Sequence, residues 1–531
     1  MPAILNGISP AVSSRLKKRL QSAQPFWLVF MAMLSIAVAL QWVAGAFRSE
    51  FWGFDEAAHF VTGVMVHDYI ASIARVAPMK FAQDFYAHYP KVALGHWPPV
   101  FYIVQALWTL LFSVSRASLL LLQAVIAALI AVTLWSIWRR HWGELTAFVA
   151  GASFLLLPAV QDQTNTVMAE ALLTLWMLLA VVNYESYLKR GDWRSAILFS
   201  CFTIAAVLTK ANGWCLMLVP AVAMVLARRF DLLRRGSFWF PAAAVAFVCL
   251  PWYLLTFKMA SNGWRAAKQS RFFESVIAFN ARAQVAVLGW VLLGLALAGI
   301  LLYVLRPARQ KAVTPRWAAF AAWWAAVFLF HTFLAPVREI RHQTLAAPAA
   351  LSFAWAAVAW ARTRFRAHAW FQPVILASAV ALFFLTTFHV AYKPVYGAKY
   401  VVAMLTPQLR SNQTVLVSSS WAGEGAIVAE TVLQERHSAP VILRASKLFT
   451  ESDWGGWNRK LTVTTPEEAL AVLRRNRVSV VIVDLHSGEQ AGEAPQQRLL
   501  LRTIQTYPNC FQALGLTDAA EKFFRAYSFR T

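Results

Sequence analysis

The sequence ASLLLLQAVIAALIAVTLWSIW, residues 117–138, contains no charged side chain and is bounded by Arg116 and Arg139. As an α-helix it would be about 33 Å long at about 1.5 Å per residue, enough to cross a hydrocarbon core of about 30 Å. Its apolar residues are continuous and do not alternate with polar ones, which is typical of a transmembrane helix and not of a β-barrel strand. This stretch therefore predicts a helical membrane protein.

Further apolar runs extend this prediction to eleven membrane spans. The other runs are residues 26–46, 144–160, 169–187, 195–210, 213–228, 238–257, 284–305, 317–335, 344–361 and 372–391. The composition agrees, because 59% of the residues are hydrophobic and 14% are charged, against about 45–50% and about 25% in soluble domains. These values exclude a water-soluble globule and a disordered chain.

The formal net charge of +24 would suggest a nucleic-acid partner in a soluble protein. Here the basic residues gather in short loops between the apolar runs, at 139–140, 188–194, 227–235, 306–316 and 361–366. Short cytoplasmic loops of membrane proteins collect Lys and Arg, so we predict that these loops are cytoplasmic and that nucleic acid is not a partner. Residues 1–25 are basic and no small-residue cleavage site follows, which predicts a cytoplasmic N-terminal segment and a retained first span.

A twelfth apolar run, residues 98–114, decides the topology. If it crossed the membrane, all the basic loops would face the outer side, against the positive-inside rule. We therefore interpret it as a juxtamembrane helix on the outer side that begins at Pro98–Pro99. Residues 26–391 then form a transmembrane domain whose first outer loop is 47–116, and residues 392–531 lie outside the membrane on the outer face.

This C-terminal tail is more polar and has a different pattern. Residues 413–419, 439–445 and 478–485 read as short buried strands, and residues 424–437 and 465–477 read as amphipathic helices. The alternation predicts a small α/β domain with a parallel sheet. It carries no dinucleotide-binding or P-loop signature, and we interpret it as a lid or docking module.

Acidic residues are rare in this chain, so those near a predicted membrane surface are candidate functional groups. Asp55 and Glu56 follow the first span in GFDEAAHF. A helix from Asp55 to Ala74 would present Asp55, His59 and Thr62 on one face, because residues three and four apart are neighbours. The alternative interpretation is that Asp55 caps this helix.

Glu170 begins the fourth predicted span, just below the outer surface. A carboxylate at membrane depth costs about 2.5–3.5 kcal/mol, so it usually faces a polar cavity and indicates function. Favourable placement at a helix N-terminus is the alternative interpretation. Asp162, in the preceding turn, is a less buried alternative acid.

The segment DFYAHYPKVALGHWPPVFY, residues 84–102, concentrates His88, Lys91 and His96 beside aromatic residues. An aromatic belt at the headgroups is the simpler interpretation. Alternatively, Lys91 and the two histidines could bind an anion, which makes Lys91 a candidate for the donor phosphate. A divalent metal held by Asp55, His96 and Glu170 is a hypothesis that rests on ligand type alone, since the spacing is not that of a strong metal motif. The cysteines form no CxxC pair or disulfide framework.

Basic residues on the predicted outer side form a small set, which snorkelling or lipid contact explains one at a time. The set is Lys210 between spans five and six, Arg338 and Arg341 between spans nine and ten, and Lys258, Arg265, Lys268 and Arg271 in the loop 258–283. Together they lie on the same face as the two acids, and arginine suits a phosphate through its bidentate fork.

Outer-face acids with outer-face cations favour one reaction class. The cations would hold the phosphate of a lipid-linked sugar, and a carboxylate would deprotonate an acceptor hydroxyl, as glycosyl transfer requires. A lipid-linked glycan flippase or transporter would instead place charges at the bilayer midplane in two matched halves. A ligase that moves a whole glycan at the outer face would use much the same parts and remains open.

The chain resembles the GT-C superfamily of polytopic glycosyltransferases, in the branch of the protein O-mannosyltransferases and the bacterial lipid A aminoarabinose transferase. The resemblance is carried by FDEAAHF (54–60), HWPPVFY (96–102), TNTVMAEALLTLWMLLA (164–180), WRSAILFSCFTIAAVLTKANGW (193–214) and PVREIRHQTLAAPAAL (336–351). It implies a multi-pass protein of the bacterial plasma membrane. It also implies an inverting transfer of a hexose or pentose from a polyprenyl phosphate to a hydroxyl acceptor.

The resemblance also implies roles for individual residues. Asp55 falls on the family's first-loop acid, the base or its partner, and Glu170 on the second outer-loop acid. Lys210 and either Arg338 or Arg341 fall on the phosphate-side basic positions. At His96–Trp97 the sequence departs from relatives that carry an acid and a lysine there, which leaves the metal site and the role of Lys91 open.

Overall fold

The computed structural model describes residues 10–53, 55–73, 75–261, 272–365, 370–436, 440–451, 460–486 and 494–530, and within these the side chains from Pro25 onward except those of 272 and 273. Arg265, Lys268 and Arg271 lie outside the described residues.

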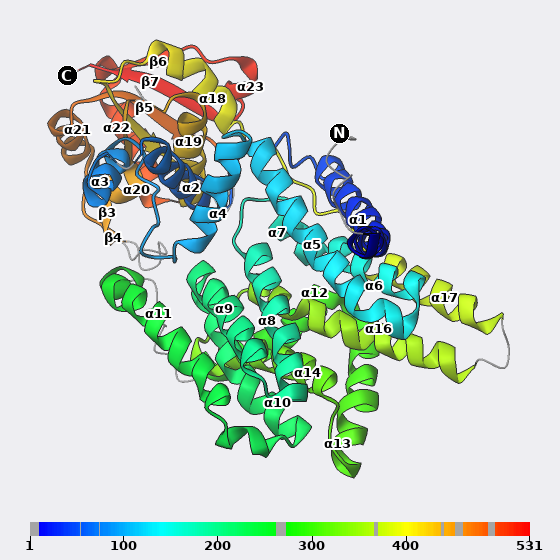
Figure 1. The fold of residues 1–531 in the computed structure, drawn as a ribbon. Helices are drawn as coiled ribbons and strands as arrows, with labels where there is room; N and C mark the ends of the chain where they lie inside the picture. Colours follow the sequence, from blue (N-terminus) through cyan, green and yellow to red (C-terminus); the bar gives the residue numbers. More distant parts are fainter. Residues whose placement is uncertain are drawn as a thin grey trace.

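Helices make up the part of the chain that the sequence assigns to the membrane (Figure 1). They are α1 (Pro10–Val43), α5 (Arg116–Trp142), α6 (Glu144–Leu156), α7 (Pro158–Thr164), α8 (Glu170–Arg190), α9 (Trp193–Thr209), α10 (Val219–Ala227), α11 (Gly236–Ser261), α12 (Phe272–Ile300), α13 (Arg306–Gln310), α14 (Pro315–Leu329), α15 (Ile340–Gln343), α16 (Ala347–Arg364) and α17 (Phe371–Thr386). The first outer loop forms α2 (Glu56–Ala71), α3 (Pro78–His88) and α4 (Val100–Leu111).

Seven described helices are long and apolar enough to cross a membrane, or eight if the bent pair α6 and α7 forms one span. The remaining three predicted spans coincide with shorter apolar helices, Trp193–Thr209, Ala211–Ala227 and Phe371–Thr386. The first of these has 17 residues and would reach about 26 Å, and the second begins with 3₁₀ turns. The chain is a polytopic membrane protein, as predicted.

The predicted juxtamembrane helix is α4, which has 12 residues. At about 18 Å it is too short to cross the bilayer. It packs along α2, where Gly63 allows the side chain of Gln105 to approach the helix backbone. Both helices thus form a layer that carries Asp55 and His59.

The tail forms a five-stranded sheet in the order β2-β1-β5-β7-β6 and a two-stranded sheet, β3-β4. The strands are β1 (Thr414–Ser418), β2 (Val441–Arg444), β3 (Thr450–Glu451), β4 (Lys460–Leu461), β5 (Val478–Asp484), β6 (Phe511–Leu514) and β7 (Phe524–Phe529). The pairs β1–β2 and β1–β5 are parallel, as predicted, with Leu416 opposite Leu443 and Val481. The pairs β5–β7 and β6–β7 are antiparallel. The prediction of a parallel sheet was therefore wrong for this edge, because FQAL and FRAYSF have no strong strand pattern in the sequence.

The tail helices are α18 (Ala398–Leu405), α19 (Trp421–Gln434), α20 (Ala445–Leu448), α21 (Pro466–Arg475), α22 (Pro495–Thr506) and α23 (Asp518–Glu521). Two of them, α19 and α21, match the predicted helices. Thr465 and Glu468 form a capping box at the start of α21, with Pro466 in the first turn.

The tail packs against the first outer loop, and Figure 1 shows α2, α3 and α4 beside it. The ring of Trp52 stacks on that of Tyr396 at 4.4 Å between centroids and also contacts His486 and Phe524. The Glu50 carboxylate accepts hydrogen bonds from the backbone N–H groups of Tyr396 (2.7 Å) and Gly397 (2.9 Å). The segment just before Asp55 is therefore held by the tail at two points.

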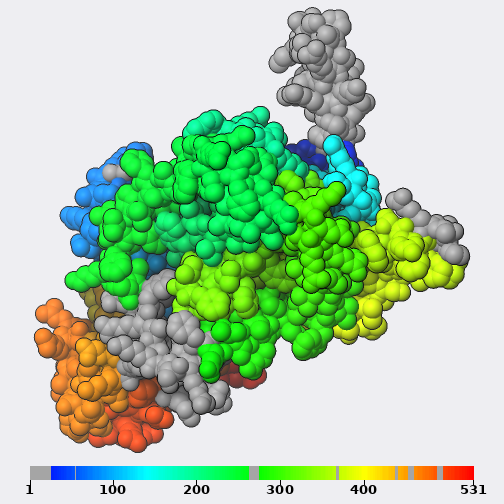
Figure 2. Space-filling model, turned by 90° about the horizontal axis from the view of Figure 1, so that it is seen from below, coloured from blue at the N-terminus to red at the C-terminus, as the bar shows by residue number. Residues whose placement is uncertain are grey.

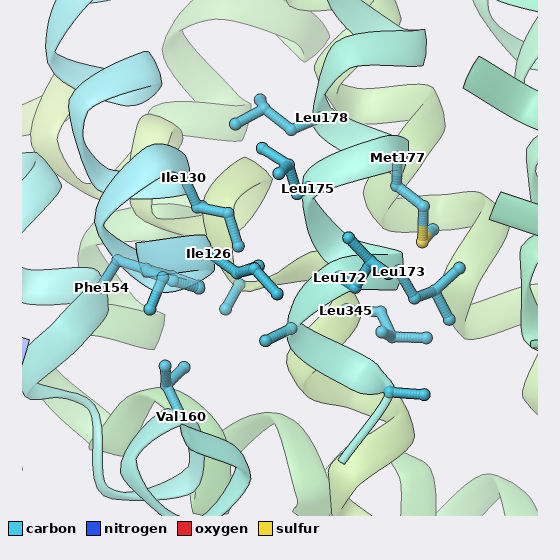
Figure 3. Packing of buried hydrophobic residues seen from close by; sticks show 14 of the residues in the cluster. Ile126, Ile130, Phe154, Val160, Leu172, Leu173, Leu175, Met177, Leu178 and Leu345 are labelled. Atoms are coloured by element: carbon cyan, nitrogen blue, oxygen red, sulfur yellow. The ribbon is translucent and has the colours of Figure 1, made fainter. Parts of the chain in front are cut away.

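One hydrophobic core runs through the helices and into the tail. It includes the packing of α5, α6 and α8 drawn in Figure 3, around Ile126, Phe154 and Leu172, and continues to Val415 and Phe524 of the sheet. Figure 2 shows the tail, in orange and red, at one end of the molecule and α17, in yellow, at the other. Because the core is shared, the tail and the first loop form one packed unit.

We predict that Gly423→Ala destabilises this junction. A Cβ atom at Gly423 would lie 2.7 Å from the Trp52 ring and still closer to the Ser419 hydroxyl, and overpacking of this kind costs about 1–3 kcal/mol. The melting temperature of the purified protein should fall. Gly515→Ala is the control, because a Cβ atom there meets nothing within 4 Å. Equal melting temperatures for the two variants would contradict the prediction.

Candidate active site

A buried ion pair lies at the start of α8. Glu170 is the first residue of this helix, and Lys210 follows the last residue of α9. The Lys210 Nζ donates to Glu170 Oε1 at 2.5 Å, and both side chains are buried. The lysine offsets the cost of placing a carboxylate at this depth.

Arg341, on α15, joins this pair to the first outer loop. Its Nη1 donates to Asp55 Oδ2 at 2.6 Å, its Nε lies 3.7 Å from Glu170 Oε1, and it also contacts Glu339. Asp55 and Glu170 are 115 positions apart in the sequence, yet one guanidinium contacts both. We call Asp55, Glu170, Lys210 and Arg341 the acid–base cluster. The structure thus brings together the two predicted acids and two of the four predicted phosphate-binding residues.

Asp55 occupies the N-cap position of α2 but makes no side-chain capping hydrogen bond. The alternative interpretation of Asp55 as a helix cap is therefore wrong, because its carboxylate turns to Arg341 instead. Burial alone would raise the pKa of Asp55, but the charges of Arg341 and Lys210 outweigh it and lower the pKa to about 2.

His59 lies one turn further along α2, as predicted. Its Nδ1 and the Tyr102 hydroxyl are 3.1 Å apart, and its ring packs on Trp97. Burial and the charge of Lys210 lower the pKa of His59 to about 3, so the imidazole is neutral at physiological pH.

Glu56 points away from the acid–base cluster. Its Oε1 accepts hydrogen bonds from Arg116 Nη1 (2.6 Å) and from the backbone N–H of Val167 (3.1 Å). It anchors the start of α2 to α5 and to the turn before Glu170, which positions the two acids relative to each other.

Several polar residues in apolar helices next to the cluster were not predicted. The rings of His331 and His342 stack at 4.9 Å, Asn212 Nδ2 lies 2.7 Å from His331 Nε2, and Gln284 Nε2 donates to Gln343 Oε1 at 2.7 Å. The signal was present in KANGW and REIRHQ, where polar residues interrupt apolar runs, since buried polar groups in a span usually mark a site.

Within the described residues, four buried atoms around the cluster lack a hydrogen-bond partner: Glu170 Oε2, His59 Nε2, His342 Nδ1 and Gln343 Nε2. Buried polar atoms are nearly always paired. Arg341 is the most exposed member of the cluster, with 22% of its side chain accessible. The cluster therefore keeps hydrogen-bonding capacity that the described residues do not use.

The remaining predicted site residues are not members of the acid–base cluster, although Lys91 lies near enough to Asp55 to interact with its charge. Lys91 donates from Nζ to the Trp421 carbonyl at 3.2 Å, at the start of α19, and burial and the charge of Arg444 lower its pKa to about 7. His88 is the last residue of α3, and His96 lies in the loop before α4, where burial lowers its pKa to about 4. Arg338 is exposed, three residues before Arg341.

The metal hypothesis does not fit this arrangement. No group of three or more His, Cys, Asp or Glu side chains within the described residues is placed to hold a metal ion. The two acids already contact Arg341, so a divalent ion between them would have to displace a guanidinium.

Comparison with known proteins shows a shared fold. The chain has the fold of solved structures of the GT-C superfamily, and residues 96–254 match the family model of dolichyl-phosphate-mannose-protein mannosyltransferases. The resemblance drawn from the sequence is confirmed at this level.

Particular solved structures share the fold. ArnT from Cupriavidus metallidurans, bound to undecaprenyl phosphate, matches with a TM-score of 0.61 and 13% identity over 94% of this chain and 98% of its own. The oligosaccharyltransferase from Archaeoglobus fulgidus matches with a TM-score of 0.55 and 14% identity over 86% of this chain and 68% of its own. No curated protein matches the chain in sequence.

We predict that Lys210→Met lowers stability by about 3 kcal/mol, because it leaves a buried carboxylate with one cation fewer. Adding Glu170→Gln to the same chain should recover part of the loss, as a double-mutant cycle of melting curves would show. Lys393→Met is the control, because its partner Asp162 is 56% exposed and such pairs contribute under about 1 kcal/mol. Additive effects of the two buried changes would contradict the pairing.

Proposed function

We propose that this protein is an inverting glycosyltransferase that moves a sugar from a polyprenyl phosphate to a hydroxyl acceptor at the outer face of the membrane. The observation that carries the proposal is the acid–base cluster, in which Arg341 contacts both Asp55 and Glu170 and Lys210 contacts Glu170. It is supported by the GT-C fold, since the C. metallidurans structure of that fold is described as bound to undecaprenyl phosphate.

Arg341 and Lys210 are the candidate ligands of the donor phosphate. In the proposed step the acceptor oxygen forms a bond to the anomeric carbon while the bond from that carbon to the phosphate oxygen breaks. The acceptor proton passes to the Asp55 carboxylate, and the charge gained by the leaving lipid phosphate is stabilised by the two cations. A single displacement from the opposite face inverts the anomeric centre.

Binding of the donor would make Asp55 a stronger base. Arg341 helps to keep the pKa of Asp55 near 2, where a carboxylate is a weak base. A phosphate that binds Arg341 competes for the same guanidinium and adds a negative charge nearby. Both effects raise the pKa of Asp55 and make it a better base when the donor is bound.

Glu170 has a different proposed role. Its contacts with Lys210 and Arg341 fix both cations at the donor end of the site. Arg338, exposed near the same turn, is a second candidate for the phosphate. Lys91 would act through the junction with the tail, given its contact with Trp421.

The proposed location rests on the basic loops of the sequence and on its resemblance to the family. We infer a bacterial plasma membrane, a cytoplasmic N-terminus and a tail on the outer side that covers the first loop and selects the acceptor. A flippase is disfavoured because Glu170 is at the first residue of α8 and not at its middle. A ligase that transfers a whole glycan remains the second candidate, because it needs the same cations.

We predict that Asp55→Asn reduces transfer at least about a hundredfold, the scale of a lost general base. Release of polyprenyl phosphate from a labelled polyprenyl-phosphate sugar, in membranes that supply the acceptor, measures this. Asp162→Asn removes an acid that is exposed and paired with Lys393, and it should keep full activity. Normal transfer by a folded Asp55→Asn variant would remove Asp55 from the mechanism and this function with it.

We also predict a difference between two pH profiles. The value of kcat/KM reports the free enzyme, in which the pKa of Asp55 is about 2, so it should show no Asp55 limb above about pH 4. The value of kcat reports the donor complex, in which this pKa is higher, so its acidic limb should appear at a higher pH. Acidic limbs at the same pH would contradict activation by the donor.

A further inference from the structure

A second site lies at the ends of the helices that are far from the acid–base cluster. It is a cavity of about 400 Å³, and the residues that matter for its chemistry are Trp142, Lys189, Tyr303, Arg316, Trp317 and Trp360. They come from the end of α5, the end of α8, the π-helical turn before α13, the start of α14 and the end of α16.

Helix geometry gives the depth of this cavity. Glu170 and Lys189 are on α8, 19 residues apart, which corresponds to about 29 Å along the helix axis. Because the hydrocarbon core is about 30 Å thick, the cavity lies at the headgroups of the leaflet opposite the acid–base cluster. Trp and Tyr are typical of this depth.

The walls of the cavity are preformed aromatic surfaces. The ring of Trp138 stacks between Trp142 at 4.3 Å and Trp317 at 4.7 Å, and Tyr303 stacks on Trp317 at 4.6 Å. Trp360, at the mouth, is 41% exposed. Rings held by one another cannot easily collapse into the space, so the walls offer a fixed apolar surface.

The polar side of the cavity has an excess of positive charge. Lys189 Nζ lies 2.5 Å and Arg316 Nε 3.0 Å from the same oxygen, Oε1 of Glu185, so two cations share one carboxylate. The Lys189 side chain is 47% exposed. His141 adds a further group that can become cationic, and no acidic residue lines the cavity among the described residues.

We propose that this cavity binds the headgroup of an anionic phospholipid from the leaflet opposite the acid–base cluster. Lys189 and Arg316 contact the phosphate, and the glycerol and upper acyl chains lie against Trp142 and Trp360. A free phosphate would use the two cations alone and leave the aromatic walls in contact with water, which is why a lipid is the better occupant. This site does not depend on the proposed sugar transfer.

The lipid would have a structural effect, because its contacts join helices that also build the acid–base cluster. The helix α8 carries Glu170 at its other end, and α16 follows directly after the turn that carries Arg341. A ligand that binds only the folded arrangement stabilises it in proportion to its occupancy.

The test uses the purified full chain in a neutral detergent and counts bound lipids by native mass spectrometry. Phosphatidylglycerol is the probe, and phosphatidylcholine with the same acyl chains is the comparison. The double variant Lys189→Gln/Trp360→Ala should bind phosphatidylglycerol at least about fivefold more weakly, since one surface cation alone contributes about that factor. The single variant Lys189→Gln keeps every aromatic wall. It tests the loss of the cation if the double variant does not fold.

Arg190→Gln/Trp193→Ala is the matched control. It removes a neighbouring cation and an exposed Trp at the same ends of the helices, and neither residue lines the cavity. This control should bind phosphatidylglycerol as tightly as the parent chain does. Adding the lipid should raise the melting temperatures of both proteins by the same amount.

Three results would overturn the proposal. One is equal binding of phosphatidylglycerol by the double variant and the control. Another is equal binding of phosphatidylcholine by the parent chain, which would mean that charge is not recognised. The third is displacement of the lipid by inorganic phosphate at the same concentration, which would mean that Lys189 and Arg316 bind a free anion and not a lipid headgroup.

Discussion

The contact of Arg341 with Asp55 and Glu170 is the interaction on which the rest of the structure depends. Two carboxylates, the buried Lys210 and the partly buried Arg341 lie within a few ångströms of one another in an apolar protein, and the opposite charges offset the cost of burying each one. The contact joins the first outer loop, the start of α8 and the turn before α16. Two further contacts fix the first outer loop near Asp55. Arg116 binds Glu56, and the backbone N–H of Tyr396 donates to Glu50.

Much of the fold could be predicted because the signal is physical and repeated. Apolar runs bounded by basic loops specify spans and their direction, and the predicted runs coincide with helices or pairs of helices. The short helix α4 was distinguished from a span by loop charge alone, and its length agrees with that reasoning. The strands β6 and β7 were missed because FQAL and FRAYSF lack a strong pattern, and they make the sheet mixed where a parallel one was expected.

The sequence predicted which residues belong to the site, but it did not predict which of them contact one another. Asp55 and Glu170 stood out because acids are rare beside the spans, and Lys210 and Arg341 because they lie on the same face. Nothing in the sequence says that one arginine contacts both acids, since residues 55 and 341 meet only through packing. The stacked rings of His331 and His342 depend on tertiary contacts in the same way. Lys91 is a further example, because its contact with Trp421 lies at the junction with the tail and local sequence does not encode it.

The junction around Trp52 has a consequence for how the protein is made. The ribosome produces Trp52 early, whereas its partners Tyr396, His486 and Phe524 emerge only after all the predicted membrane spans. Throughout synthesis and membrane insertion, the segment that carries Asp55 lacks the surface that fixes it. The junction at Trp52 can therefore be completed only after the tail has been made, and a chain truncated before β7 would lack the contact with Phe524.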